Sequence, residues 1–290
     1  MILRILALSS IFGVCGGLLA QDGAVVFKTD VRLVEVYATV FDHHGRYLDG
    51  LSGNSFELLD EGVKQPIVTF ESNVSNLSCA ILLDTTGSMF RALPGVKNAV
   101  LRLIDQFRDR DSLAVYSFNT SLDVLQDFTI DKAALKTAVL RTRAAGQTAL
   151  FDAISQAAAA IGKRSGKKSM IVFTDGDDNA SVLNANAALS RVKKLGIPIY
   201  SIAEGEAVQS PALSRGLKEI SQFTGGVAYT VKKPKDVEAV FQDISEDLQH
   251  GYMLTYKPPA AHGFGWRKIQ LVLNDQKDYR LRAREGYLPE

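Results

Sequence analysis

Apolar residues change their spacing twice along this 290-residue chain, and the two changes limit the folds open to it. From Val31 to Phe70 apolar and polar residues alternate, which is the period of strands with one buried face. Near Ser78 the pattern changes to short continuous apolar runs, as in 79–83, separated by segments with helical spacing, as in 96–107. After Gly251 the alternation returns. The middle pattern is typical of a parallel sheet covered by helices on both faces.

The two alternating segments, residues 25–76 and 251–290, each supply only about three or four strands, which is marginal for a separate core. We therefore expect one β-sandwich built from both ends of the chain. A doubly wound, mostly parallel α/β domain of residues 77–250 is inserted between them, so the predicted fold class is α/β.

The N-terminus predicts export. Residues 1–20 place Arg4 before an apolar stretch and end in Ala20, which is typical of a secretory signal peptide. The stretch is short for a membrane span of roughly 20 residues, so we expect a periplasmic or extracellular protein without a stable membrane span. The formal net charge of +1 gives no long-range attraction for nucleic acid.

Polar side chains follow two of the predicted strands and precede one predicted helix. Because ligands of open α/β sheets bind at the carboxyl ends of the strands, we expect these side chains to meet at one edge of the sheet, with Asp84, Ser88 and Thr148 at a solvent-facing rim. They comprise two carboxylates and three hydroxyls, which are hard oxygen ligands that suit Mg²⁺ or Mn²⁺, and Ca²⁺ less tightly. The set is Asp84, Thr86, Ser88, Thr148 and Asp175.

At these residues the sequence resembles the von Willebrand factor type A (VWFA) domain family over about residues 77–249. The resemblance rests on Asp84-x-Thr86-x-Ser88, on Thr148 in Gly-Gln-Thr-Ala-Leu, and on Asp175 in Phe-Thr-Asp-Gly. The order of signal peptide, β-rich flank, α/β domain and final Arg-Ala-Arg-Glu-Gly-Tyr strand is similar to secreted bacterial VWFA-related proteins of the acidobacterial type.

The resemblance implies a metal-ion-dependent adhesion site (MIDAS) that binds a protein partner through an acidic side chain, without catalysis. It implies direct coordination by Ser88 and Thr86, coordination by Thr148 directly or through water, and action of Asp84 and Asp175 largely through water. The family pattern has Ser where Thr86 stands, but the hydroxyl is kept, so we expect metal binding to be retained.

The resemblance also implies that movement of the last helix accompanies a change of affinity. We predict that helix at 237–248, and only His250 and Gly251 separate its end from the strand beginning at Tyr252. So short a joint should transmit an axial shift of the helix to the sandwich, in which we place Tyr252, Leu254 and Tyr256 in the core.

Two other functions stay open. A metal-dependent hydrolase or phosphatase would use Asp84 as a nucleophile, but Thr86 stands where such enzymes keep a second Asp, and no general base is evident. A metal-independent scaffold of an envelope assembly is the other.

Three further sequence features allow more than one interpretation or predict exposed charge. Met89 and Phe90 could contact a partner or pack beneath their loop. The basic run at 163–168 predicts a solvated helix end, and that at 280–284 a charged edge strand.

Overall fold

The computed structural model describes residues 33–72, 75–233, 236–259, 265–274 and 278–289. All of these belong to one compact unit, residues 32–290. The signal peptide predicted at 1–20 lies outside the described residues. Within the described part, no helix combines the length and the apolar character that a membrane span requires.

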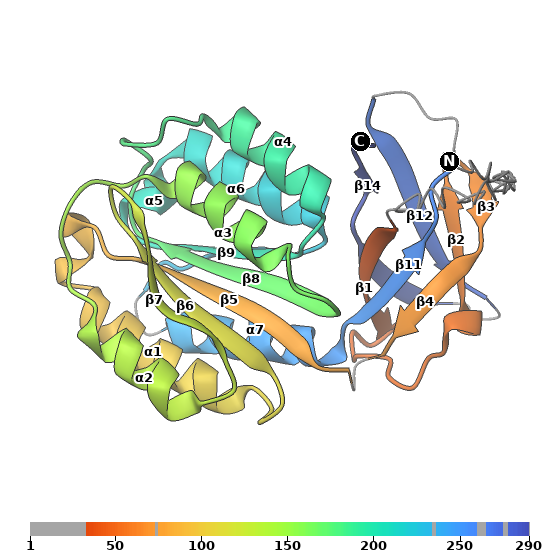
Figure 1. Cartoon of the computed structure of the whole chain (residues 1–290), viewed down its shortest axis with the longest axis horizontal. Coiled ribbons are helices and arrows are strands. Elements are labelled where there is room, and N and C mark those ends of the chain that lie inside the picture. The colour runs from red at the N-terminus through yellow and green to blue at the C-terminus, as the bar shows by residue number, and fades with distance from the viewer. Residues whose placement is uncertain (1–32, 73–74, 234–235, 260–264, 275–277, 290) are drawn as a thin grey trace, which may run out of the picture. The chain divides into compact units, whose positions relative to one another are not determined.

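A six-stranded sheet forms the centre of the α/β part (Figure 1). Neighbouring strands are parallel, except that β7 runs antiparallel to β6. The chain passes from β5 to β6 on one side and later places β8 on the other side of β5, so the switch of strand order lies at β5. In spatial order the strands are β10 (Ala228–Thr230), β9 (Ile199–Ala203), β8 (Lys167–Thr174), β5 (Leu77–Asp84), β6 (Ser112–Phe118) and β7 (Leu122–Thr129).

Helices cover both faces of this sheet (Figure 1). One face carries α1 (Leu93–Gln106), α2 (Lys132–Arg141) and α7 (Val237–His250). The other face carries α3 (Leu150–Ile161), α4 (Ala185–Leu195), the single turn α5 (Glu206–Gln209) and α6 (Pro211–Thr224). The last helix thus extends two residues beyond the predicted end and reaches His250.

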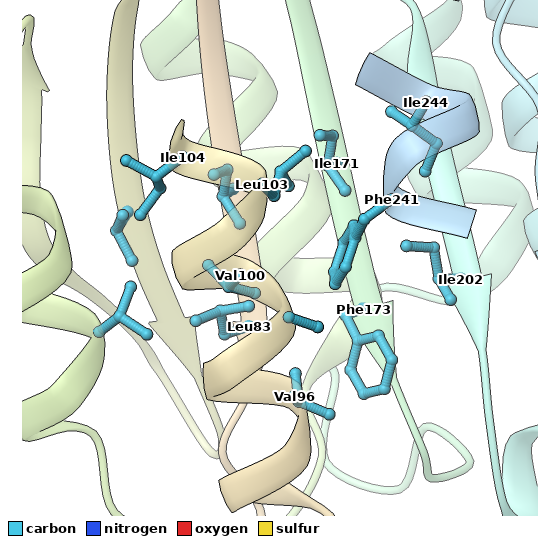
Figure 2. Close-up of a cluster of buried hydrophobic side chains, with 14 of the residues drawn as sticks. Leu83, Val96, Val100, Leu103, Ile104, Ile171, Phe173, Ile202, Phe241 and Ile244 are labelled. Atoms are coloured by element: carbon cyan, nitrogen blue, oxygen red, sulfur yellow. The ribbon is translucent and has the colours of Figure 1, made fainter. Parts of the chain in front are cut away.

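The alternation of side chains along β5 builds two cores. Cys79, Ile81 and Leu83 belong to one cluster of buried residues, and Ala80 and Leu82 to the other. Truncating a leucine in such a core to alanine costs about 2–5 kcal/mol of stability. Figure 2 shows the first core, in which Leu83, Ile171, Phe173 and Ile202 of the sheet meet Val96, Val100, Leu103 and Ile104 of α1 and Phe241 and Ile244 of α7.

The terminal segments form two antiparallel four-stranded sheets that share one core, so the predicted sandwich is confirmed. Each sheet combines strands from both ends of the chain; for example, Val36 lies opposite Leu254. Tyr252, Leu254 and Tyr256 are buried in this core, as predicted. One sheet has the order β13 (Tyr279–Ala283), β1 (Val34–Asp42), β11 (Tyr252–Tyr256) and β4 (Ile67–Glu71). The other has β14 (Gly286–Tyr287), β12 (Arg267–Leu273), β2 (Phe56–Asp60) and β3 (Val63–Gln65), with the 3-10 turn η1 (Gly53–Ser55) before β2.

The expectation of a solvated helix end at 163–168 is wrong in part. Lys167 and Lys168 begin β8 and are buried. Lys167 Nζ donates to the Gly251 carbonyl at 2.6 Å, and Lys168 Nζ pairs with Glu35 at 2.7 Å. β13 is an edge strand, as predicted, but Arg284 just beyond it is buried and donates both to the Glu35 carbonyl of β1 and to the Lys193 carbonyl of α4. These cations therefore tie the terminal sheets to the α/β part.

Candidate metal centre

The first loop of the site connects β5 to the 3-10 turn η2 (Gly87–Phe90). Asp84 ends β5, and its Oδ1 accepts a hydrogen bond from the Thr86 backbone N–H at 2.9 Å. This bond folds the loop back over the end of the strand. Thr86 Oγ1 and Ser88 Oγ are hydrogen-bonded at 2.9 Å. The alternate residues 84, 86 and 88 therefore converge.

The loop after β8 reaches the same point. Ser88 Oγ donates to Asp175 Oδ1 at 2.8 Å, and Thr174 Oγ1 donates to Asp84 Oδ2 at 2.7 Å. Two side-chain hydrogen bonds thus join loops that are about 90 residues apart in the sequence. Both loops follow neighbouring parallel strands of the central sheet, so both strand ends lie at one edge.

Thr148 enters from the loop before α3 and is held by the loop after β8. Its N–H donates to Asn179 Oδ1 at 2.9 Å, and its carbonyl accepts from the Asn179 N–H at 3.0 Å. A Cβ built on Gly176 would lie 3.4 Å from Thr148 Oγ1 and 3.5 Å from Ser88 Oγ. The two hydroxyls therefore border the same point beside Gly176, and three loops contribute to one site.

The expectation of a solvent-facing rim is wrong for Asp84 and Thr148, two of the three residues to which it applied. Ser88 alone among the five is exposed. The other four, Asp84, Thr86, Thr148 and Asp175, are buried. The site therefore presents a hydroxyl at its surface and keeps both of its carboxylates beneath.

Sequence reasoning missed three supporting residues: Thr174, Asn179 and Asp178. Thr174 directly precedes Asp175 in the sequence, but its hydrogen bond to Asp84 depends on the pairing of β5 with β8. Asp178 accepts a hydrogen bond from the Phe151 N–H at 2.9 Å, in the first turn of α3. It serves the helix terminus, where unpaired N–H groups favour a carboxylate.

Burial dominates the electrostatics of the site. It raises the pKa of the Asp84 carboxyl, because the charged form loses its water. Burial, opposed by the Ser88 hydrogen bond and reinforced by the negative charge of Asp84, raises the pKa of Asp175 to about 6. Burial and the negative charge of Asp175 also raise the pKa of Glu204, the residue that follows β9. A cation at this point would offset the repulsion among these acids.

The donor set fits a hard divalent cation. Within the described residues, no group of three or more His, Cys, Asp or Glu side chains is arranged to hold a metal ion. The site instead combines two carboxylates with three hydroxyls, and such oxygen ligands suit Mg²⁺, Mn²⁺ or Ca²⁺.

The described histidines do not supply a general base to this site. His250 is hydrogen-bonded to Asp49 at 2.8 Å and stacks on Tyr47. His43 and His44 lie in the turn after β1. Of the described histidines, therefore, none stands beside Asp84 or Asp175.

Comparisons with known proteins agree with this architecture. The family model of the von Willebrand factor type A domain matches residues 79–243. Searching curated proteins gave no match. Among solved structures, a von Willebrand factor type A protein from Catenulispora acidiphila is 14% identical, with a TM-score of 0.52 over 90% of this chain and 75% of that one.

Two further structures share the fold. The PilB minor pilin from Streptococcus sanguinis is 14% identical, with a TM-score of 0.52 over 60% of this chain and 61% of the pilin. Proximal thread matrix protein 1 from the mussel byssus is 20% identical, with a TM-score of 0.53 over 65% of this chain and 49% of that protein. At these identities the similarity concerns the fold alone. This chain spans less than two thirds of the pilin and less than two thirds of the byssus protein.

Proposed function

Because the chain belongs to the von Willebrand factor type A domain family, we propose that it is an exported protein-binding module that depends on a divalent metal ion. The observation that supports this most strongly is the convergence of three loops on one all-oxygen site, fastened by the Ser88–Asp175 hydrogen bond and by the two hydrogen bonds between Thr148 and Asn179. Mg²⁺ is the cation we favour, with Mn²⁺ or Ca²⁺ as substitutes.

Each predicted residue keeps a distinct role in this proposal. Ser88 and Thr86 bind the cation directly, Thr148 binds it directly or through water, and Asp84 and Asp175 act largely through water. The bound cation supplies a positive charge that attracts a carboxylate of the partner. Because the hydroxyl ligands are neutral and only two of the five proposed ligands are carboxylates, the cation keeps its attraction for that further carboxylate.

The surface next to the site offers an apolar contact for the partner. Met89 is fully buried, whereas Phe90 is 76% exposed. Met89 therefore packs beneath the loop, whereas Phe90 is accessible to a partner. Exposed aromatic side chains near the centre of an interface often dominate its binding energy. We assign Phe90 to the contact with the partner, two residues after Ser88.

Isothermal titration calorimetry tests the metal dependence. We expect the protein to bind Mg²⁺ or Mn²⁺ with 1:1 stoichiometry, and the Asp84→Ala variant to bind neither. Absence of binding by the unmodified protein, or unchanged binding by the variant, would contradict the proposal.

Capture of a partner from envelope extract, in Mg²⁺ and in EDTA, tests the function. We expect a protein that the chelator releases, and equal capture in EDTA would favour the metal-independent scaffold. Metal-dependent turnover of phosphate esters that disappears in Asp84→Asn would favour the hydrolase.

N-terminal sequencing of the exported protein tests the signal peptide at 1–20, and we expect the mature chain to begin after Ala20.

A further inference from the structure

Glu204 lies directly beside the strand end that carries Asp175. It follows β9, and its backbone N–H donates to the Thr174 carbonyl at 3.0 Å. In the same loop, the Ala207 N–H donates to the Asp175 carbonyl at 3.0 Å. The loop after β9 is therefore fastened to the loop that brings Asp175 to the site.

Gly205 allows this close approach. Its φ is +58°, and a Cβ at this position would lie 3.2 Å from the Asp175 carbonyl oxygen and 3.5 Å from Asp175 Cβ. A residue with a side chain would be strained there and would crowd Asp175. The backbone thus holds Glu204 and Asp175 on adjacent strand ends.

One oxygen of the buried Glu204 carboxylate has no compensating donor among the described residues. The residue is 6% exposed, and its Oε2 has no hydrogen-bond partner among the described residues. Within the described part of the chain, neither Glu204 nor Asp175 nor Asp84 forms an ion pair with a basic side chain. A buried carboxylate oxygen without a donor is costly, and a second carboxylate nearby adds repulsion.

From this arrangement we infer that Glu204, which lies outside the ligand set, raises the affinity of the site for a divalent cation through its negative charge. The inference rests on the proposed function, because it takes the cation of that site as given. Affinity for hard cations rises with the number of negative charges around them. Glu204 acts on the cation through its charge, together with Asp175, and a bound cation offsets the mutual repulsion of the two carboxylates.

Glu204→Gln removes the charge and keeps the shape. Residues that hydrogen-bond metal ligands typically change metal affinity 10- to 100-fold; since Glu204 acts through its charge alone, we expect the lower end of this range, a loss of about tenfold in Mg²⁺ affinity. In metal-free buffer the same variant should melt at a higher temperature than the unmodified protein, because a buried charge is gone. The rise in melting temperature on adding saturating Mg²⁺ should be smaller than in the unmodified protein.

The matched control is Glu206→Gln. Glu206 carries the same charge two residues farther along the loop and also repels the Asp175 carboxylate, but it is exposed. Water screens an exposed charge, so we expect its Mg²⁺ affinity to stay within about twofold. Glu204→Met, an apolar side chain of similar length, should reproduce the loss of affinity and again raise the metal-free melting temperature. It checks that the effect of Glu204→Gln does not arise from misfolding.

Calorimetry and thermal unfolding on these variants separate this inference from the proposed function. If the unmodified protein binds Mg²⁺, Asp84→Ala does not, and both Glu204 variants bind like the unmodified protein, the inference about Glu204 is overturned and the proposed function stands. A lower metal-free melting temperature in both Glu204 variants would also overturn it, since the carboxylate would then stabilise the fold. If the unmodified protein binds no divalent cation, both fail.

Discussion

Arg282 of β13 forms an ion pair with Asp247 of α7, which joins the terminal β-sheets to the last helix of the α/β part. The Asp247 carboxylate also accepts a hydrogen bond from the Tyr200 hydroxyl of β9. Arg282 donates in addition to Thr39 Oγ1 of β1 at 3.0 Å. Asp247 is 3% exposed, so its charge depends on these partners more than on water.

Replacing Arg282 by methionine should destabilise the protein strongly. The change leaves the Asp247 carboxylate buried without a cation, which costs about 3–5 kcal/mol. Urea denaturation measures the loss in free energy of unfolding. Arg280→Met, an exposed position on the same strand, is the control and should change stability by less than about 1 kcal/mol. In the double variant Arg282→Met with Asp247→Asn, part of the loss should be recovered; the same loss as in Arg282→Met would show that the buried charge is not the cause.

The joint between α7 and β11 should transmit movement to the sandwich. Gly251 is the single residue between them; its φ of −75° is open to any residue, and Lys167 holds its carbonyl. Insertion of several Gly and Ser residues after Gly251 should therefore weaken partner binding in saturating Mg²⁺. It should also abolish the change in hydrogen exchange of residues 252–256 on binding. If both measurements equal those of the unmodified protein, the two parts are merely tethered.

Ser88→Ala should separate metal binding from stability. Ser88 is exposed, so its loss removes a proposed ligand without opening a cavity, although it also takes a hydrogen-bond donor from Asp175; the melting temperature in metal-free buffer should therefore fall less than in Asp84→Ala. Asp84→Ala should abolish Mg²⁺ binding too, but it also deprives Thr174 and the Thr86 N–H of their acceptor. We expect a loss of about 1–3 kcal/mol in unfolding free energy for Asp84→Ala. Equal stability losses in both variants would contradict this division of roles.

The stability of the metal-free protein should fall as the pH rises toward 6. The pKa of Asp175 is about 6 in the folded protein and 3.8 for an unperturbed aspartate, so between these values the folded state holds a proton that the unfolded state has lost. This contribution to stability is fully present below about pH 4. It decreases as the pH rises and is lost above about pH 6. Asp84 and Glu204, whose pKa values are also raised, act in the same direction. In urea titrations from pH 4 to 7, Asp175→Asn should show a smaller decline.

Magnesium should change this pH dependence. A cation binds the ionised carboxylates, so added Mg²⁺ should stabilise the protein more at pH 7.5 than at pH 5. An equal shift in melting temperature at both pH values would mean that Mg²⁺ binds away from Asp175.

Phe90→Ala should weaken capture of the partner and leave the fold intact. The ring is mostly exposed, so its removal costs little folding energy, whereas a central aromatic in an interface typically contributes more than about 2 kcal/mol. Ile130→Ala is a matched control, because Ile130 is also exposed, at 61%, but lies between β7 and α2. Thermal unfolding and partner capture in Mg²⁺ measure the two effects. Equal capture by both variants would place the interface elsewhere.

Much of the fold can be predicted from the sequence because its signals are local. Apolar alternation identifies the strands of the sandwich, and the continuous run at 79–83 identifies a strand buried on both faces. The candidate site is predictable for a related reason. Asp84 and Asp175 each directly follow an apolar strand, and parallel strands bring their carboxyl ends to one edge of the sheet.

Only the tertiary structure decided which polar side chains are buried and what they contact. Lys168 and Arg284 look like solvated charges in any short window of sequence, yet both are buried against Glu35, which lies more than 130 residues away from each. The same holds for Glu204, whose burial beside Asp175 follows from the pairing of β9 with β8. Periodicity reports which face of an element is apolar, but the partner of a charge is set by elements that meet only when the chain folds.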